Sequence, residues 1–196
     1  MSRTKYGKTR TVPYRRKREG RTNYKKRLTL LKSGSPRLVL RKSLNMITAQ
    51  IIEYNPDGDR ILVSATSKDL HKMGWKMHRG NIPSAYLTGL LLGVKAKKKK
   101  INNFVLDIGL QTPIRGGRLF AALKGLIDSG VEMNFSKEAF PSDARISGKH
   151  IAEYASKLSK DPQKYQKQFS GCIKQGVKPE DMCKHFEDTK KKVIAS

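Results

Sequence analysis

Alternation of apolar and polar residues predicts three β-strands in the first third of the chain. Residues 36–42 and 46–54 place leucine, isoleucine or alanine at every second position, and residues 60–66 have a similar composition. The segment Pro56-Asp57-Gly58-Asp59, between the second and third strands, is a strong turn signal. The three strands are therefore expected to form a meander, with helices covering at least one face.

Apolar residues at helical spacing predict helices on both sides of this meander. Residues 21–33 carry an apolar stripe, with Thr22 as a plausible N-cap and Gly34 directly after the end. Ser67 is expected to cap a short helix that ends at Lys72. We expect the first of these helices to dock the N-terminal segment onto the body of the protein.

A longer helix is predicted from residue 83 to about residue 97. It places the small residues Ala85, Gly89 and Gly93 four positions apart on one face. Glycine inside a helix costs about 1 kcal/mol relative to alanine, so the glycines indicate close approach of another backbone. That backbone is either the sheet or the sugar-phosphate chain of a nucleic acid.

The remaining elements of the body complete a mixed α/β domain. They are a buried strand at residues 103–108, a helix at 118–129 and a short last strand at 131–135. The predicted order is βββαβα with a possible final strand, in three layers. This is the order of ribonuclease-H-like folds.

The chain divides into three parts by composition. Residues 1–35 form a basic arm with its helix, residues 36–135 the α/β core, and residues 136–196 a polar, loop-rich helical extension. Short helices are expected in the extension near residues 142–146, 149–157, 161–169 and 179–193. We expect this extension to become ordered on a partner.

Charge favours a nucleic-acid partner. The chain has a formal net charge of +26, and residues 1–32 alone contain 13 Lys or Arg against one acid, Glu19. This cationic stretch has almost no aliphatic residue before Leu28 and can lie along a polyanion, where each neutralised phosphate releases a counterion. The tyrosines Tyr6, Tyr14 and Tyr24 lie between the cations and can stack on exposed RNA bases. A solubilising tail is the alternative interpretation of this arm.

Other partners and compartments fit the composition less well. An anionic membrane would require bulky apolar anchors beside the charges, and the arm lacks them. The N-terminus has no apolar signal-peptide core, and no apolar run approaches the length of a membrane span. Cys172 and Cys183 are expected to be free thiols in a soluble protein of a reducing compartment.

We find no catalytic motif and expect no cofactor, metal or enzymatic activity. Cys172, Cys183 and His185 have no standard zinc spacing and lack a fourth ligand. A metal-dependent nuclease of ribonuclease-H-like fold is an alternative, but it needs several clustered carboxylates. The first strand contains none, and Asp107 at the end of the fourth strand is more suited to accepting loop hydrogen bonds. A general cationic nucleic-acid-binding protein is a further alternative.

Several segments in order resemble one ribosomal protein family. They are PRLVLRKSLNMITAQIIEY, SATSKDL, GNIPSAYLTGLLLG, VLDIGL and SGKHIAEY. They look like archaeal large-subunit ribosomal protein eighteen, whose eukaryotic counterpart is large-subunit protein five. The C-terminal 40 residues resemble the family poorly, and no role is carried over to them. The resemblance implies an inactive ribonuclease-H-like core and a cytoplasmic protein located in the large ribosomal subunit.

The resemblance also implies a set of partners and RNA contacts. The partners are 5S rRNA, large-subunit rRNA and neighbouring proteins of the central protuberance. The basic arm corresponds to the family's RNA-binding arm, and the turn after the first strand corresponds to a hairpin that contacts 5S rRNA. Turn side chains such as Ser43 can also bond riboses and phosphates, although turn chemistry alone explains them equally well. The candidate RNA-binding residues are Arg10, Tyr14, Arg15, Arg16, Lys17, Arg18, Arg21, Tyr24, Lys25, Arg27, Arg41, Lys42, Ser43, Asn45, Gln50, Thr66, Arg115 and Arg118.

Overall fold

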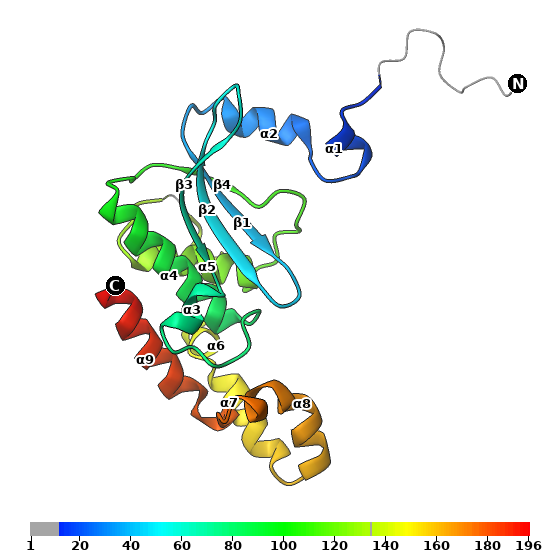
Figure 1. Cartoon of the computed structure of the whole chain (residues 1–196), viewed down its shortest axis with the longest axis vertical. Coiled ribbons are helices and arrows are strands. Elements are labelled where there is room, and N and C mark those ends of the chain that lie inside the picture. Colours follow the sequence, from blue (N-terminus) through cyan, green and yellow to red (C-terminus); the bar gives the residue numbers. More distant parts are fainter. Residues whose placement is uncertain (1–11, 134) are drawn as a thin grey trace, which may run out of the picture.

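The computed structural model describes residues 12–133 and 135–196 of the chain. Within these residues the strands form one four-stranded sheet in the order β3-β2-β1-β4 (Figure 1). The pairs β1–β2 and β2–β3 are antiparallel, whereas β1 and β4 are parallel. The strands are β1 (Arg37–Lys42), β2 (Ile47–Glu53), β3 (Arg60–Thr66) and β4 (Val105–Asp107).

Helices and short 3-10 turns make up the rest of the secondary structure in the described residues. They are α1 (Arg15–Arg18), α2 (Tyr24–Leu31), α3 (Asp69–Lys72), α4 (Ile82–Lys98), α5 (Arg118–Asp128), η1 (Lys137–Ala139), α6 (Asp143–Ile146), α7 (Lys149–Leu158), α8 (Pro162–Lys174), η2 (Pro179–Asp181) and α9 (Met182–Ala195). The mixed α/β class and the order βββαβα are confirmed, and so is the short helix predicted to end at Lys72, which is α3 between β3 and α4.

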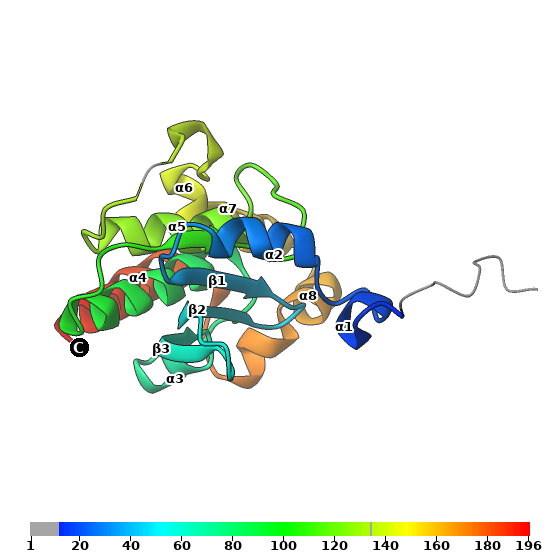
Figure 2. The same cartoon turned by 90° about the horizontal axis from the view of Figure 1, so that it is seen from above.

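The buried face of the sheet follows the predicted alternation. Leu38 pairs with Ile51 across β1 and β2, and Ile51 pairs with Val63 across β2 and β3. These side chains and their neighbours two residues along, Leu40 and Ala49, are all buried. They pack against α4 and α5, which lie on one side of the sheet (Figure 2). Their burial contributes to the hydrophobic stabilisation of the core.

The glycines of α4 are explained by α5. A Cβ atom at Gly89 would overlap the backbone carbonyl of Ala122, and one at Gly125 would overlap the carbonyl of Tyr86. The two helices therefore touch backbone to backbone at this crossing. The partner backbone predicted for Gly89 is that of α5, rather than the sheet or a nucleic acid.

Several predicted element ends differ from the structure. Asn23, not Thr22, caps α2, because its Oδ1 accepts the Lys26 N–H at 3.1 Å. Ser67 does not cap α3; it is fully buried, and its Oγ accepts the Ile47 N–H at 3.1 Å.

The strand predicted at residues 131–135 is also wrong. No strand forms at residues 131–133 or 135, and position 134 is outside the described residues. Val131 instead packs its side chain into the core. The apolar side chain of Val131 requires burial but not a strand, and here it is buried from a loop.

The C-terminal extension packs on the body. Val193, Phe186 and Met182 of α9 are buried in the same core as α4, and the ring of Phe186 lies 5.6 Å from that of Tyr86. The expectation that the whole extension awaits a partner is therefore wrong for α9. In Figure 1 the helices α7 and α8 lie at the opposite end of the molecule from α1.

None of the helices in residues 12–133 and 135–196 combines the length and apolar character needed to cross a bilayer.

Candidate nucleic-acid interface

The described part of the basic arm folds as a tight cationic turn. Helix α1 consists of four consecutive cations, and Glu19 after it lies 3.4 Å from Arg15 and 3.2 Å from Arg21. These ion pairs are exposed and contribute at most about 1 kcal/mol each, so a phosphate can replace the carboxylate at low cost. Lys17 and Arg18 are exposed as well. Arg10 lies outside the described residues.

Two tyrosines of the arm pack on each other. The ring centroids of Tyr14 and Tyr24 are 5.0 Å apart and tilted by 41°. Tyr14 is 72% exposed, whereas Tyr24 is half-buried. The pair leaves an aromatic surface open to solvent beside the cations of α1, which is the combination that unpaired RNA bases stack on.

Helix α2 is attached to the sheet by polar contacts. The predicted apolar stripe is wrong at Leu28, whose side chain is 59% exposed. Instead, Arg27 donates to both carboxylate oxygens of Asp59 at 2.8 and 2.9 Å, and Lys26 Nζ donates to the Gly109 carbonyl at 3.2 Å. The sequence places Asp59 only in a turn, and its role depends on the tertiary structure.

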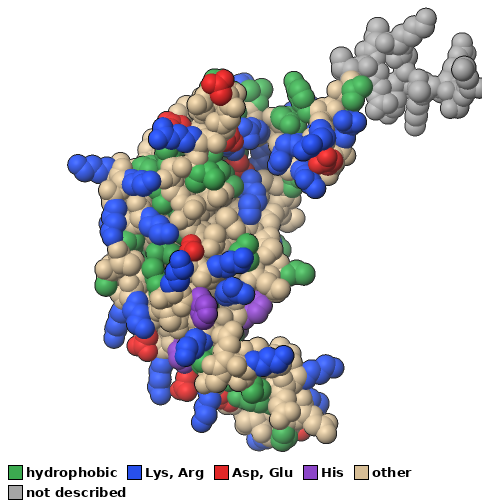
Figure 3. All heavy atoms as spheres, in the orientation of Figure 1, with side chains coloured by type: hydrophobic (Ala, Val, Ile, Leu, Met, Phe, Trp, Pro, Cys, Tyr) green, Lys and Arg blue, Asp and Glu red, His purple; other side chains and the backbone are tan. Residues whose placement is uncertain are grey.

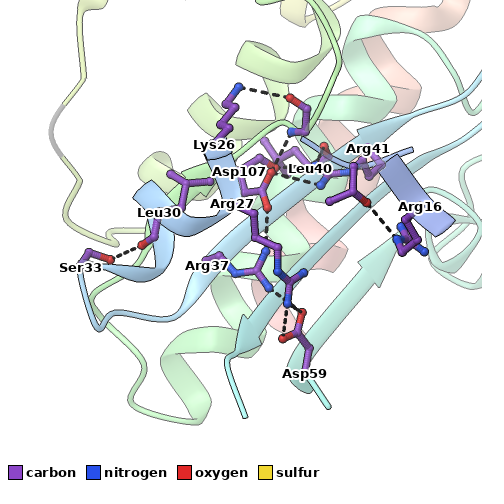
Figure 4. Close-up of polar contacts among 12 residues, drawn as sticks. Arg16, Lys26, Arg27, Leu30, Ser33, Arg37, Leu40, Arg41, Asp59 and Asp107 are labelled. Atoms are coloured by element: carbon purple, nitrogen blue, oxygen red, sulfur yellow. Dashed lines mark hydrogen bonds and ion pairs between the residues drawn. The ribbon is translucent and has the colours of Figure 1, made fainter. Parts of the chain in front are cut away.

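A chain of alternating charges continues from Asp59 into the protein (Figure 4). Arg37 donates to Asp59 at 2.6 Å and to Asp107 at 2.8 Å, and Arg41 lies 3.1 Å from Asp107. Arg37 is 3% exposed and Asp107 6% exposed. Buried charges require partners of this kind, because an unpaired one would be strongly destabilising.

The environment of Asp107 keeps it ionised. Burial alone would raise the pKa of this carboxyl, but Arg41, the Gly109 N–H and Arg37 outweigh burial and hold the pKa below its ordinary value. The Gly109 N–H donates to Asp107 Oδ1 at 2.8 Å, as expected for a carboxylate that accepts loop hydrogen bonds. Arg41 remains 41% exposed at its side chain, so it is only partly occupied by this network.

The β1–β2 turn is a closed hairpin with an exposed tip. The Ser43 N–H donates to the Met46 carbonyl at 2.8 Å, and Ser43 Oγ accepts the Met46 N–H at 3.0 Å. Leu44 and Asn45 at the tip are exposed. Beside the turn, the Gln111 side chain bonds the backbone of Lys42 at 2.7 and 3.1 Å. Ser43 therefore builds the turn itself and presents Asn45 to solvent.

Arg118 holds this hairpin against the body. Its guanidinium donates to the Ser43 carbonyl at 3.1 Å and to the Gly80 carbonyl at 2.8 Å. The pKa of His78 is lowered mainly by burial, and the charges of Arg118 and Arg79 lower it further. In this structure Arg118 is engaged within the protein.

Of the remaining candidates, Gln50, Thr66 and Arg115 lie outside the arm, and Lys25 lies on its helix. Gln50 and Thr66 are half-buried on β2 and β3, on the face of the sheet opposite Ile51. Arg115 is on the loop before α5, 3.7 Å from Glu138, and both of these side chains are exposed. Lys25 is exposed on α2. In Figures 1 and 2 α1 and the β1–β2 turn project from the same side of the molecule.

Comparison with known proteins identifies the family. Residues 8–104 match the profile of the family described as ribosomal large subunit proteins 60S L5 and 50S L18. Large ribosomal subunit protein uL18 of Methanococcus maripaludis is 49% identical over 183 residues, which cover 93% of this chain and 95% of that protein. The chain belongs to this family.

Family membership fixes the general role of the protein. It is a structural protein of the large ribosomal subunit and not an enzyme. The alignment with uL18 covers 93% of the chain and so extends into the C-terminal extension, whereas the family profile ends at residue 104. Within the described residues, no three His, Cys, Asp or Glu side chains are grouped to hold a metal ion, and Cys172 and Cys183 are free.

Proposed function

We propose that this member of the uL18 family binds 5S rRNA and attaches it to large-subunit rRNA in the central protuberance, beside neighbouring ribosomal proteins. The observation that carries the proposal is the attachment of the cationic arm to the sheet. The Arg27–Asp59–Arg37 ion pairs connect α2 to β1, and the Tyr14–Tyr24 contact connects the start of α1 to α2, so α1 is positioned relative to the β1–β2 turn. An unattached cationic arm would bind RNA without regard to the position of the core.

We infer a division of work between these two elements. The exposed cations of α1 and the Tyr14–Tyr24 pair supply charge and stacking surface, and thus most of the affinity. The turn with Ser43 and Asn45 supplies hydrogen bonds that determine where the core lies on the RNA. Gln50, Thr66 and Arg115 are further proposed contacts.

We also propose that the core is a ribonuclease-H-like domain that has no catalytic role. Three antiparallel strands followed by a parallel fourth strand and flanking helices support this assignment. Asp107, whose position at the end of β4 suggested a nuclease alternative, is instead occupied by two arginines. The domain then serves as a scaffold for the arm and the hairpin.

Replacement of the α1 cations tests the proposal. Glutamine at Arg15, Arg16, Lys17 and Arg18 should weaken 5S rRNA binding at least about tenfold near 0.1 M salt. It should also make the plot of log affinity against log salt shallower by about 3, since each phosphate contact contributes roughly 0.7–0.9 to the slope. Filter binding across a salt series measures both quantities.

A matched variant controls for total charge. Glutamine at the exposed lysines Lys68, Lys72, Lys178 and Lys191 removes the same charge elsewhere. Equal losses in the two variants would contradict the proposed role of α1. Equal affinity of the unmodified protein for duplex DNA and 5S rRNA would favour a general cationic nucleic-acid-binding protein instead.

A further inference from the structure

The C-terminal extension encloses a groove that the proposed arm and hairpin do not use. It has a volume of about 900 Å³ and lies between the loop at residues 76–81, the tip of the β1–β2 hairpin, and helices α7 and α8. Figure 3 shows histidine side chains, with lysines and arginines around them, where the C-terminal helices meet the body. The size is in the range of pockets that enclose a small organic molecule.

The floor of the groove is apolar and polarisable. Met77, Phe169 and Met182 line it and are 2%, 8% and 2% exposed, and Cys172 Sγ lies 3.7 Å from Met77 Sδ. The thiol of Cys172 has its pKa raised by burial, so it remains neutral. Such a floor suits a flat uncharged group such as a nucleobase.

The rim of the groove is cationic and amide-rich. Lys76 and Arg79 are exposed on one wall, and neither makes an ion pair with another residue of the described chain. The lining residues, all of which the structure describes, include no Asp or Glu. Asparagine and glutamine side chains complete the rim and can bond base edges: Asn45, Asn81, Gln168 and Gln175.

An aromatic ring stands at the mouth of the groove. Tyr154 on α7 is 49% exposed, and its ring centroid lies 6.3 Å from that of Phe169. On the opposite wall, the Gly80 N–H donates to His78 Nδ1 at 3.1 Å. Because burial and neighbouring cations lower the pKa of His78, its imidazole is neutral and carries its proton on Nε2.

We propose that this groove binds unpaired nucleotides of ribosomal RNA. Cations without acidic neighbours suit a phosphate backbone, and the aromatic ring, amides and apolar floor suit an unstacked base. An acidic peptide would use the cations but not this floor. Asn45 belongs both to the groove and to the proposed RNA-contacting hairpin, so a strand that leaves the hairpin can enter the groove directly. The proposal goes beyond the arm-and-hairpin contact and can fail without affecting it.

Histidine NMR signals of the full-length protein test this groove separately from the arm. The chain has only four histidines; His78 and His150 line the groove, whereas His71 and His185 do not. A single-stranded RNA octamer of mixed sequence should shift the signals of His78 and His150 and leave those of His71 and His185 in place. The same octamer annealed to its complement should not, because its bases are stacked and paired.

Substitutions of Tyr154 test whether its ring contacts the RNA. Tyr154→Ala should raise the RNA concentration for half-maximal shift of the groove signals about fivefold or more, the lower end of the effect of losing one stacking platform. Tyr154→Phe should retain binding. Tyr54→Ala, at a tyrosine of similar exposure (52%) outside the groove, should also retain it. Far-ultraviolet circular dichroism confirms that each variant is folded.

Three outcomes of the NMR experiment would overturn the proposal. They are unshifted groove signals when RNA saturates the protein by fluorescence anisotropy, equal shifts with the duplex, and shifts with a polyglutamate peptide but not with RNA. Ultraviolet cross-linking of the peptide that contains Tyr154 identifies the source of the nucleotides, with 5S rRNA and large-subunit rRNA in separate reactions. A cross-link to either RNA supports the groove contact, and the absence of a cross-link to both RNAs contradicts it.

Discussion

At the scale of single residues, the carboxylate of Asp107 is buried between two arginines. It binds Arg37 and Arg41 and accepts a backbone N–H, while Arg37 reaches Asp59 on the other side. Loss of one partner from a buried network leaves an uncompensated charge, which costs more than loss of an exposed pair. Arg37 and Asp107 are 70 positions apart in the sequence, and only the pairing of β1 with β4 brings them together.

We predict that Asp107→Asn lowers the free energy of unfolding by about 3 kcal/mol at neutral pH. Since the folded-state pKa of Asp107 lies below its ordinary value of 3.8, its contribution is present above about pH 4 and is lost as the pH falls toward the folded pKa. Lowering the pH below 4 should therefore destabilise the variant less than the unmodified protein. Urea unfolding at several pH values measures both effects.

Asp143→Asn serves as the control for Asp107→Asn. Asp143 also pairs with a cation, Lys124, but its side chain is 91% exposed. The cost should stay below about 1 kcal/mol. Similar costs for the two variants would show that burial of the Asp107 network contributes little.

We predict that Arg118→Gln raises the pKa of His78. Burial, the first cause of the lowered value, remains, so the pKa should move toward 6.5 without reaching it. Arg115 is three positions from Arg118 in the chain but is not among the causes of the lowered pKa of His78. Arg115→Gln should therefore leave that pKa unchanged. Histidine NMR titration measures both variants. The same shift from both, or from neither, would contradict the position of Arg118 beside the Gly80 carbonyl.

At the scale of elements, the contact between α4 and α5 depends on glycine. Gly89 and Gly125 each lie against a backbone carbonyl of the opposite helix, which no residue with a Cβ atom allows without displacement. The glycines weaken their helices in isolation, and the close packing of two helices over the sheet offsets this cost.

We predict that Gly89→Ala destabilises the protein by about 2–3 kcal/mol, because overpacking at the crossing exceeds the gain in helix propensity. Gly171→Ala, in α8, is the control: nothing lies within 4 Å of its Cβ position. That variant should be neutral or more stable by up to about 1 kcal/mol. Thermal and urea unfolding compare the two, and a stabilising Gly89→Ala would contradict the close approach.

At the scale of the whole molecule, the C-terminal extension shares the core of the body. Helix α9 returns to α4 and buries Phe186 and Val193 there, while α7 and α8 extend away and enclose the groove. The cationic surface thus has two ends, the arm and the groove rim, with the exposed tip of the β1–β2 hairpin between them (Figures 1 and 3). An RNA that contacts both ends would pass the hairpin.

We predict that Val193→Ala lowers the stability of the entire protein by about 2 kcal/mol, because it leaves a cavity in the shared core. Ile194→Ala, at the next position and 58% exposed, should change it by less than about 0.5 kcal/mol. Circular dichroism and tryptophan fluorescence should report one common transition, since Trp75 lies in the same core as Val193. Separate transitions would mean that the extension folds independently.

The sequence by itself determined the order of strands and helices, because alternation at period two and spacing at period 3.6 are local properties of the chain. Leu38 and Leu40 could be assigned to one face of the first strand on this basis, and Ile47, Ala49 and Ile51 to one face of the second. The exposed cations of α1 follow from composition. The prediction that Ser67 caps a helix is wrong. A buried hydroxyl has several partners within reach, and the sequence does not show which of them it bonds.

Only the tertiary structure decided which charges are already occupied. Arg27 and Arg118 look as free as Arg16 or Lys17 in the sequence, yet they bind Asp59 and two backbone carbonyls inside the protein. The groove likewise combines residues from Asn45 to Met182, which no local pattern connects. The physical reason is that pairing and enclosure depend on distances between segments far apart in the chain, and folding alone sets those distances.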